Sequence, residues 1–112
     1  MVKPIPRHVL IHTVTYEEFQ QGDGINTEDG FKPSVTLMNV RVQSLSNIRR
    51  NSTAEGIEYD AILFFDVAHS LSTGSFEFVE KSKVIFNGKV MLVEKVNPVV
   101  ANELHHYEIG MK

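Results

Sequence analysis

Two adjacent histidines near the end of the chain are the residues best suited to chemistry. His105 and His106 lie in the segment LHHYEI, whose composition predicts a β-strand. Because neighbouring side chains of a strand point to opposite faces, the two rings are not expected to ligate one ion together. His8 and His12 would share a face, but a strand separates them by roughly 13 Å. We therefore expect no metal site, with one ring of the pair packed inward and the other exposed.

Carboxylates could supply acid–base chemistry, but their pattern does not single out a catalytic pair. Glu58 and Asp60 would share one face of a strand that also holds Asp66, and edge-strand charge or a subunit contact is the plainer interpretation. The acidic stretch 23–30 does not match a calcium-binding loop. The chain has no cysteine, no glycine-rich phosphate loop and no nucleophile elbow. We expect no catalytic residues and no cofactor, and a metal-dependent enzyme using His105 or His106 is the least favoured hypothesis.

Charge and hydropathy exclude further classes of function. The chain has 11 basic against 14 acidic residues among 112, a formal net charge of −3. Tight DNA binding is disfavoured because phosphate neutralisation by Lys and Arg supplies much of its affinity. Transient contact with DNA that slides past is compatible with a mildly acidic surface. No apolar run approaches the length of a membrane span, and the start MVKPIPR lacks the apolar core of a secretory signal.

The elements that would position these side chains are short strands separated by turn-forming residues. The predicted strands, rich in β-branched and aromatic residues, are 8–16, 35–43, 57–67, 83–86, 90–96 and 104–111. In the second strand, Val40 and Val42 would share one face, opposite Arg41 and Gln43. Asn87-Gly88 between two apolar runs predicts a hairpin with a type I′ turn.

Strand number and spacing predict an all-β fold, a small barrel or sandwich of about six antiparallel strands. Asn97-Pro98 is expected to end the strand before it, and 99–103 is the one stretch that could form a short helix. Residues 17–34 have loop composition. The polar segment 44–56, with Arg49-Arg50 at its centre, predicts a long inter-strand loop, and loops of about a dozen residues are usually functional or mobile.

The two prolines near the start predict an extended arm over residues 1–7, followed by a single β-barrel domain over 8–112. Such an arm is a natural piece to order on a neighbouring molecule. The candidate contact residues are Lys3, Pro4, Ile5, Pro6 and Arg7.

Five segments, taken in order, resemble one known family. They are PIP with LIHT (4–6 and 10–13), LMNVRV (37–42), ILFFD (62–66), KVIFNG (83–88) and LHHYEI (104–109). Together they resemble the phage minor capsid proteins of siphophages and prophages of Gram-positive bacteria. The resemblance implies a head-completion, or stopper, protein of the head–tail connector, assembled in the host cytoplasm and located in the virion. Such a protein forms a ring, retains packaged DNA and docks the tail.

The resemblance also implies partners and a site. The partners are other copies in the ring, the adjacent connector or adaptor and tail-completion proteins, and packaged DNA in transient, non-specific contact. In the stopper group, the loop between the second and third strands projects into the channel. By position, the candidate gating residues here are Ser44, Ser46, Asn47, Arg49, Arg50, Asn51, Ser52 and Thr53.

The alternative hypothesis is a small barrel of the OB type that binds single-stranded nucleic acid. Phe64, Phe65 and Tyr107 would supply rings on which bases stack. The sequence lacks the basic groove that such binding requires.

Overall fold

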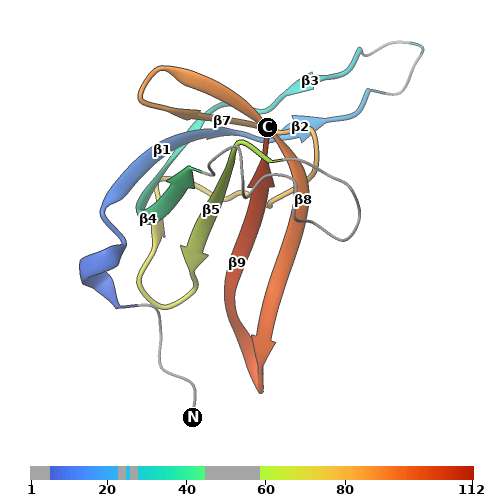
Figure 1. The fold of residues 1–112 in the computed structure, drawn as a ribbon. Coiled ribbons are helices and arrows are strands. Elements are labelled where there is room, and N and C mark those ends of the chain that lie inside the picture. Colours follow the sequence, from blue (N-terminus) through green and yellow to red (C-terminus); the bar gives the residue numbers. More distant parts are fainter. Residues whose placement is uncertain (1–5, 23–24, 26–27, 45–58) are drawn as a thin grey trace.

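The computed structural model of the chain describes residues 6–22, 25, 28–44 and 59–112. Their backbone forms one 3₁₀ turn, η1, and a series of strands (Figure 1). The elements are η1 (Arg7–Val9), β1 (His12–Glu17), β2 (Phe19–Gln20), β3 (Gly30–Phe31), β4 (Val35–Ser44), β5 (Ala61–Asp66), β6 (Leu71–Ser72), β7 (Lys83–Phe86), β8 (Lys89–Ala101) and β9 (Glu103–Met111).

Six of these strands close into an antiparallel barrel. Their order is β1-β7-β8-β9-β5-β4, and β4 pairs back onto β1, which removes the open sheet edge. The short β6 pairs with β4 beside the barrel, and β2 with β3 forms a separate hairpin. The predicted all-β fold is confirmed, and the closure makes it a barrel and not a sandwich.

The core consists of the inward-facing half of each barrel strand. Alternation places apolar residues on the inner face of every strand, as expected for a sheet with one buried side. The fully buried side chains of this core include Val14, Tyr16, Leu37, Val40, Leu63, Val84, Val93, Ile109 and Met111. The irregular connection between β6 and β7 adds Phe76 and Phe78, whose rings meet Tyr16 edge to face at 5.5 and 5.3 Å.

The β7–β8 hairpin confirms the prediction made from Asn87-Gly88. Both residues have positive φ, 52° and 81°, as a type I′ turn requires. The predicted strands 35–43 and 83–86 are also present, as β4 and β7. The first strand starts later than predicted, because Arg7–Val9 forms a 3₁₀ turn and β1 begins only at His12.

The end of the chain differs from the prediction more clearly. β8 does not stop at Asn97-Pro98 but runs on to Ala101, and 99–103 is strand and turn, with Asn102 in the left-handed region (φ 68°). β7 pairs with β8 only between Lys89 and Leu92. Proline has no backbone N–H to donate to a neighbouring strand. Pro98 is tolerated because no described strand lies along the edge of β8 that faces away from β9 at this position.

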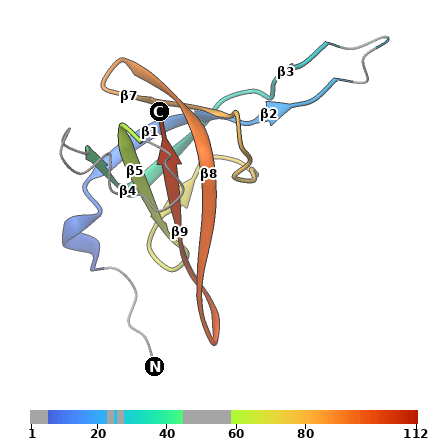
Figure 2. The same ribbon diagram turned by 45° about the vertical axis from the view of Figure 1, so that its right-hand side comes forward.

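Beyond the barrel, β8 and β9 continue as a two-stranded ribbon that projects away from the other strands (Figures 1 and 2). We call this part, residues 100–105, the ribbon. Within it, Val100 pairs with Leu104 and Ala101 with Glu103, whereas β5 joins β9 as a third strand only from His106 onward. The β2–β3 hairpin projects from a different part of the barrel (Figure 2).

Candidate functional site

The predicted gating segment lies almost entirely outside the described residues. Ser44 is the last residue of β4 and is exposed. The other candidates fall within 45–58 and lie outside the described part of the chain: Ser46, Asn47, Arg49, Arg50, Asn51, Ser52 and Thr53. The gating role of this segment therefore stays a prediction.

The predicted contact arm is described only at its end. Lys3, Pro4 and Ile5 lie outside the described residues, while Pro6 is exposed and its carbonyl accepts a hydrogen bond from the Val9 amide at 3.1 Å. Arg7 is the first residue of η1. The division into an arm at 1–7 and a barrel domain at 8–112 stays a prediction as well.

The histidine pair does not have the predicted geometry. Val99 lies opposite His106 and Val100 opposite Leu104, so His105 is the extra residue of a β-bulge. A bulge interrupts the alternation of side chains. The two rings consequently lie side by side, with their Nδ1 atoms 2.7 Å apart. Both residues are half-buried, and the expectation of one inward and one exposed ring was wrong.

These rings form a hydrogen-bonded chain. Nε2 of His106 lies 2.9 Å from Oε2 of Glu108, and its Nδ1 faces that of His105. One Nδ1 must donate and the other accept, so the contact requires an Nδ1–H on only one ring. Among the described residues, no group of three or more His, Cys, Asp or Glu side chains could hold a metal ion. The geometry explains the histidines as partners that hold the bulge at the base of the ribbon.

Asp66 is a buried structural residue. Its carboxylate accepts hydrogen bonds from the amides of Ala68 and His69 at 3.2 and 2.9 Å, and its side chain is fully buried. Asp residues often constrain turns in this way. The interpretation as edge charge or subunit contact was therefore wrong for Asp66. Asp60 is partly exposed, with one oxygen 3.8 Å from Nζ of Lys89, and Glu58 lies outside the described residues.

A second buried polar network centres on Tyr16. Its hydroxyl donates to the Glu77 carbonyl at 2.5 Å, accepts from the Val79 amide at 3.1 Å and lies 3.0 Å from Oγ of Ser82. Burial raises the pKa of Tyr16 above its ordinary value and outweighs the opposing hydrogen bonds. The network ties β1 to the irregular segment before β7.

The base of the β2–β3 hairpin is fixed by an adjoining ion pair. Glu18 accepts from the Glu77 amide at 2.7 Å and pairs with Nζ of Lys32 at 2.8 Å. Burial by itself would raise the pKa of Glu18, but the hydrogen bonds from Lys32 and the Glu77 amide outweigh it and lower the pKa. The carboxylate thus stays ionised and anchors both ends of the hairpin to the barrel.

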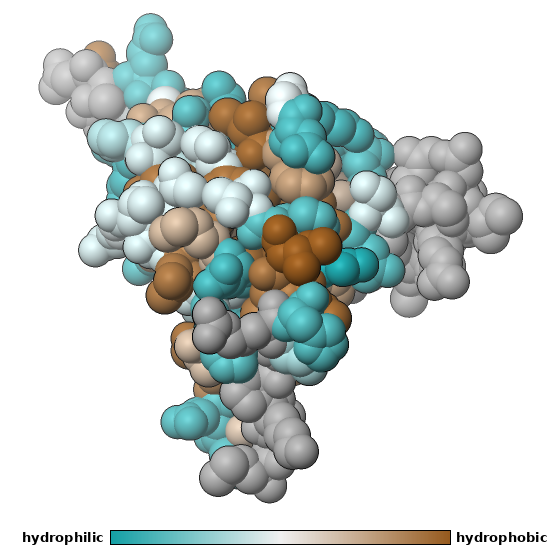
Figure 3. Space-filling model, turned by 90° about the vertical axis from the view of Figure 1, so that its left-hand side faces the viewer, coloured by the Kyte–Doolittle hydropathy of each residue, from teal (hydrophilic) through white to brown (hydrophobic). Residues whose placement is uncertain are grey.

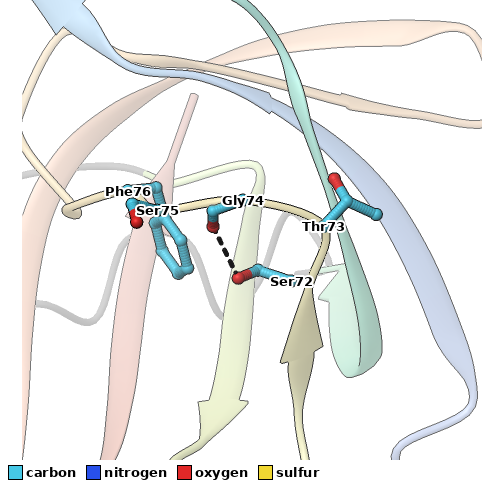
Figure 4. A pocket seen from close by; sticks show the side chains of 5 residues that line it. All are labelled: Ser72, Thr73, Gly74, Ser75 and Phe76. Atoms are coloured by element: carbon cyan, nitrogen blue, oxygen red, sulfur yellow. Dashed lines mark hydrogen bonds between the residues drawn. The ribbon is translucent and has the colours of Figure 1, made fainter.

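A hollow of about 530 Å³ lies along the segment Ser72–Phe76 (Figure 4). Two of its three hydroxyls are engaged: Oγ of Ser72 donates to the Gly74 carbonyl at 2.8 Å, and Oγ1 of Thr73 accepts from the Thr36 amide at 2.9 Å. The Phe76 ring packs against the core.

A second concavity, of about 380 Å³, lies on the outer surface of the barrel. We call it the groove, and its lining residues are Val9, Arg41, Gln43, Phe64 and His106. Arg41 stands opposite Phe64 in the β4–β5 register, and Phe64 stands opposite Glu108 in the β5–β9 register. The groove thus spans three neighbouring strands beside η1. Sequence reasoning placed Arg41 and Gln43 opposite Val40 and Val42 but did not identify the groove.

The residues that line the groove are suited to binding another molecule. It combines the apolar Phe64 and Val9 with the Arg41 guanidinium, which has no hydrogen bond or ion pair to another described residue. Burial lowers the pKa of His12, and the nearby Arg41 charge lowers it further. Nδ1 of His12 accepts a hydrogen bond from the Val42 amide at 3.0 Å. An apolar side chain together with a carboxylate would complement these groups.

One face of the molecule has a mixed surface. On the face formed by η1, β1 and β4, apolar side chains make separate patches among hydrophilic ones (Figure 3). No helix in the described ranges has the length and apolar character needed to cross a membrane.

A family model described as minor capsid protein matches residues 6–111 of the chain. No curated protein and no solved structure matches it. The match spans the whole barrel, from the residue before η1 to the end of β9.

Proposed function

The chain belongs to the minor capsid protein family of phages, and on this premise we propose that it is the head-completion, or stopper, subunit of a head–tail connector. Membership indicates a structural protein of the virus particle, located in the virion with other phage proteins. In the proposed role, copies form a ring between an adjacent connector or adaptor protein and a tail-completion protein. The ring retains packaged DNA and provides the surface on which the tail docks.

The closed barrel supports this proposal because its six strands pair in a ring and give the subunit a defined shape from which other segments project. A ring requires two different surfaces on each subunit, since a head-to-tail contact must repeat until it closes. The ribbon and the β2–β3 hairpin project from separate parts of the barrel and are available for such contacts (Figure 2).

The net charge also supports a role beside DNA. At −3, the chain would repel phosphates weakly instead of gripping them, which suits a passage that DNA must traverse. Contact with DNA would then be transient and independent of base sequence.

The observation that carries the proposal is the family match over 6–111 together with the five ordered segments. The test is a phage or prophage in which this gene is disrupted and then complemented. We expect heads that package DNA but lose it and fail to join tails, with both properties restored by the intact gene. Disrupted particles that keep their DNA and join tails normally would refute the proposed function.

No described feature favours the OB-type alternative. Phe65 and Tyr107 pack against the core, with Phe65 5.5 Å from both Phe76 and Phe78. Phe64, on the outer surface, lines the groove. These three rings therefore do not form the exposed series on which successive bases would stack.

A further inference from the structure

The pairing of β1 with β4, which closes the barrel, ends before β4 does. β1 starts at His12, which stands opposite Val40, and the register shifts between His12 and Thr13. β4 runs on to Ser44, but no described residue of β1 stands opposite Val42. Val42 is buried, and a buried amide without a strand partner needs another acceptor, because an unpaired N–H is costly.

The His12 ring supplies that acceptor. Its Nδ1 accepts a hydrogen bond from the Val42 amide at 3.0 Å, and the ring meets Phe86 of β7 edge to face with the centroids 4.8 Å apart. Val14 and Tyr16 follow at alternate positions and are both buried, so His12 lies on the inner face of β1 where the strand begins. One side chain thus joins β1 to both of its neighbours, β4 and β7.

The hydrogen bond exists only while His12 is neutral. A neutral imidazole has one donor and one acceptor nitrogen, so acceptance at Nδ1 places the hydrogen on Nε2. The imidazolium carries a hydrogen on both nitrogens and would turn a donor toward the Val42 amide, which is itself a donor. Its charge would also be repelled by the Arg41 guanidinium on β4, while β7 presents the uncharged Phe86.

We propose that neutral His12 closes the barrel at the start of β1 and that protonation of its ring opens this end. In the open state, the Val42 amide loses its partner and the first residue of β1 is released from β4, together with η1 before it. The remaining pairs, from Thr13 to Tyr16, hold the rest of β1 in place. The inference concerns the barrel itself and is independent of the proposed function.

The direction of the pH effect follows from the surroundings of the ring. Burial and, to a smaller extent, the Arg41 charge lower the pKa of His12 below its ordinary value of 6.5. Between the folded-state pKa and 6.5, the unfolded chain binds a proton that the folded chain does not. Stability is therefore complete above 6.5 and is lost as the pH falls from 6.5 through the folded-state pKa.

Nuclear magnetic resonance of the natural chain tests the contact directly. At neutral pH, Nδ1 of His12 should have the nitrogen shift of an unprotonated acceptor, and the Val42 amide should be protected from hydrogen exchange. As the pH falls, the His12 shift and the Val42 protection factor should change together, with a midpoint below 6.5. Arg41→Gln should raise this midpoint, because it removes the charge that opposes protonation.

Two substitutions separate the acceptor from the ring. His12→Phe keeps an aromatic ring beside Phe86 but has no acceptor, so it should lower Tm at neutral pH by about 5 °C and expose the Val42 amide to exchange. His12→Asn places an amide oxygen near the position of Nδ1, and this oxygen does not titrate. It should keep the Val42 amide protected on both sides of the natural midpoint.

His8→Asn is the matched control, because His8 is exposed, and it should leave Tm and its pH dependence unchanged. Three outcomes would overturn the proposal. They are a Val42 amide in the natural chain that does not respond when His12 is protonated, full protection of that amide in His12→Phe, and a pH dependence of Tm in both His12 variants equal to that of the natural protein.

Discussion

Removal of one buried hydroxyl should measurably weaken the barrel. Tyr16→Phe keeps the ring and its edge-to-face contacts with Phe76 and Phe78 but deletes the oxygen. The Val79 amide and the Glu77 carbonyl then lose their partner, whereas Oγ of Ser82 still accepts from the Phe19 amide at 2.9 Å. The change thus isolates the polar link between β1 and the segment before β7.

The magnitude follows from the two groups left without a partner. A buried polar group that loses its hydrogen bond costs about 1–3 kcal/mol. Because Glu77 is exposed and Val79 only half-buried, water can partly replace the hydroxyl, and the low end of that range applies to each. We expect a loss of about 2 kcal/mol in the free energy of unfolding. For a domain of this size that lowers Tm by about 8 °C.

Thermal and urea unfolding followed by circular dichroism would measure this loss. Tyr107→Phe is the matched control, because its ring contacts Phe78 at 5.1 Å while no hydrogen bond joins its hydroxyl to another described residue. The control should stay within about 0.5 kcal/mol of the natural protein. Equal effects of the two substitutions, or no effect of Tyr16→Phe, would refute the assignment of the network.

Three further predictions concern packing, pH and the long connection. Gly110→Ala should destabilise the barrel by about 1–3 kcal/mol in urea unfolding, because a Cβ there would lie 2.6 Å from the Tyr59 ring, whereas Gly30→Ala, with open space, should be nearly neutral. The pKa of Glu18 in the folded state lies below its ordinary value of 4.5, so its ion pair stabilises above that pH and is lost as pH falls through the folded pKa. Glu18→Gln should therefore lower the free energy of unfolding at neutral pH. In this variant the free energy of unfolding should also decline less steeply as the pH falls, and an unchanged pH dependence would contradict the prediction. Deletion of 46–53 should leave Tm unchanged, since polar loops tolerate shortening, but should impair DNA retention in particles; a collapse of Tm would show that the segment is packed structure.

Structural features that depend only on residues close together in the sequence were predicted correctly. The type I′ turn requires positive φ at two consecutive residues, and Asn87-Gly88 meets this requirement, so the hairpin lies where it was predicted. The alternation in β4 placed Val40 and Val42 in the core and Arg41 on the outer surface, because side-chain direction in a strand repeats every two residues. These features follow from local backbone geometry, which the sequence encodes directly.

Features that depend on how distant segments pair were not predicted. The histidine rings meet because β8 and β9 pair with a bulge at His105, and a bulge is a property of two strands together. Pro98 stays within β8 because no described strand lies along its other edge, which composition could not reveal. Likewise, Tyr16 finds its hydrogen-bond partners 61 to 66 residues away.

The sequence by itself determined the all-β class, most strand positions, the family and the absence of any recognisable catalytic motif. Only the tertiary structure decided which outward side chains from β4, β5 and β9 come together as the groove, and that the last hairpin extends beyond the barrel as a ribbon. The physical reason is that alternation fixes the face on which a side chain lies, whereas strand order and register fix its neighbours. Arg41 is outward by sequence, but its place beside Phe64 and His106 follows from barrel closure.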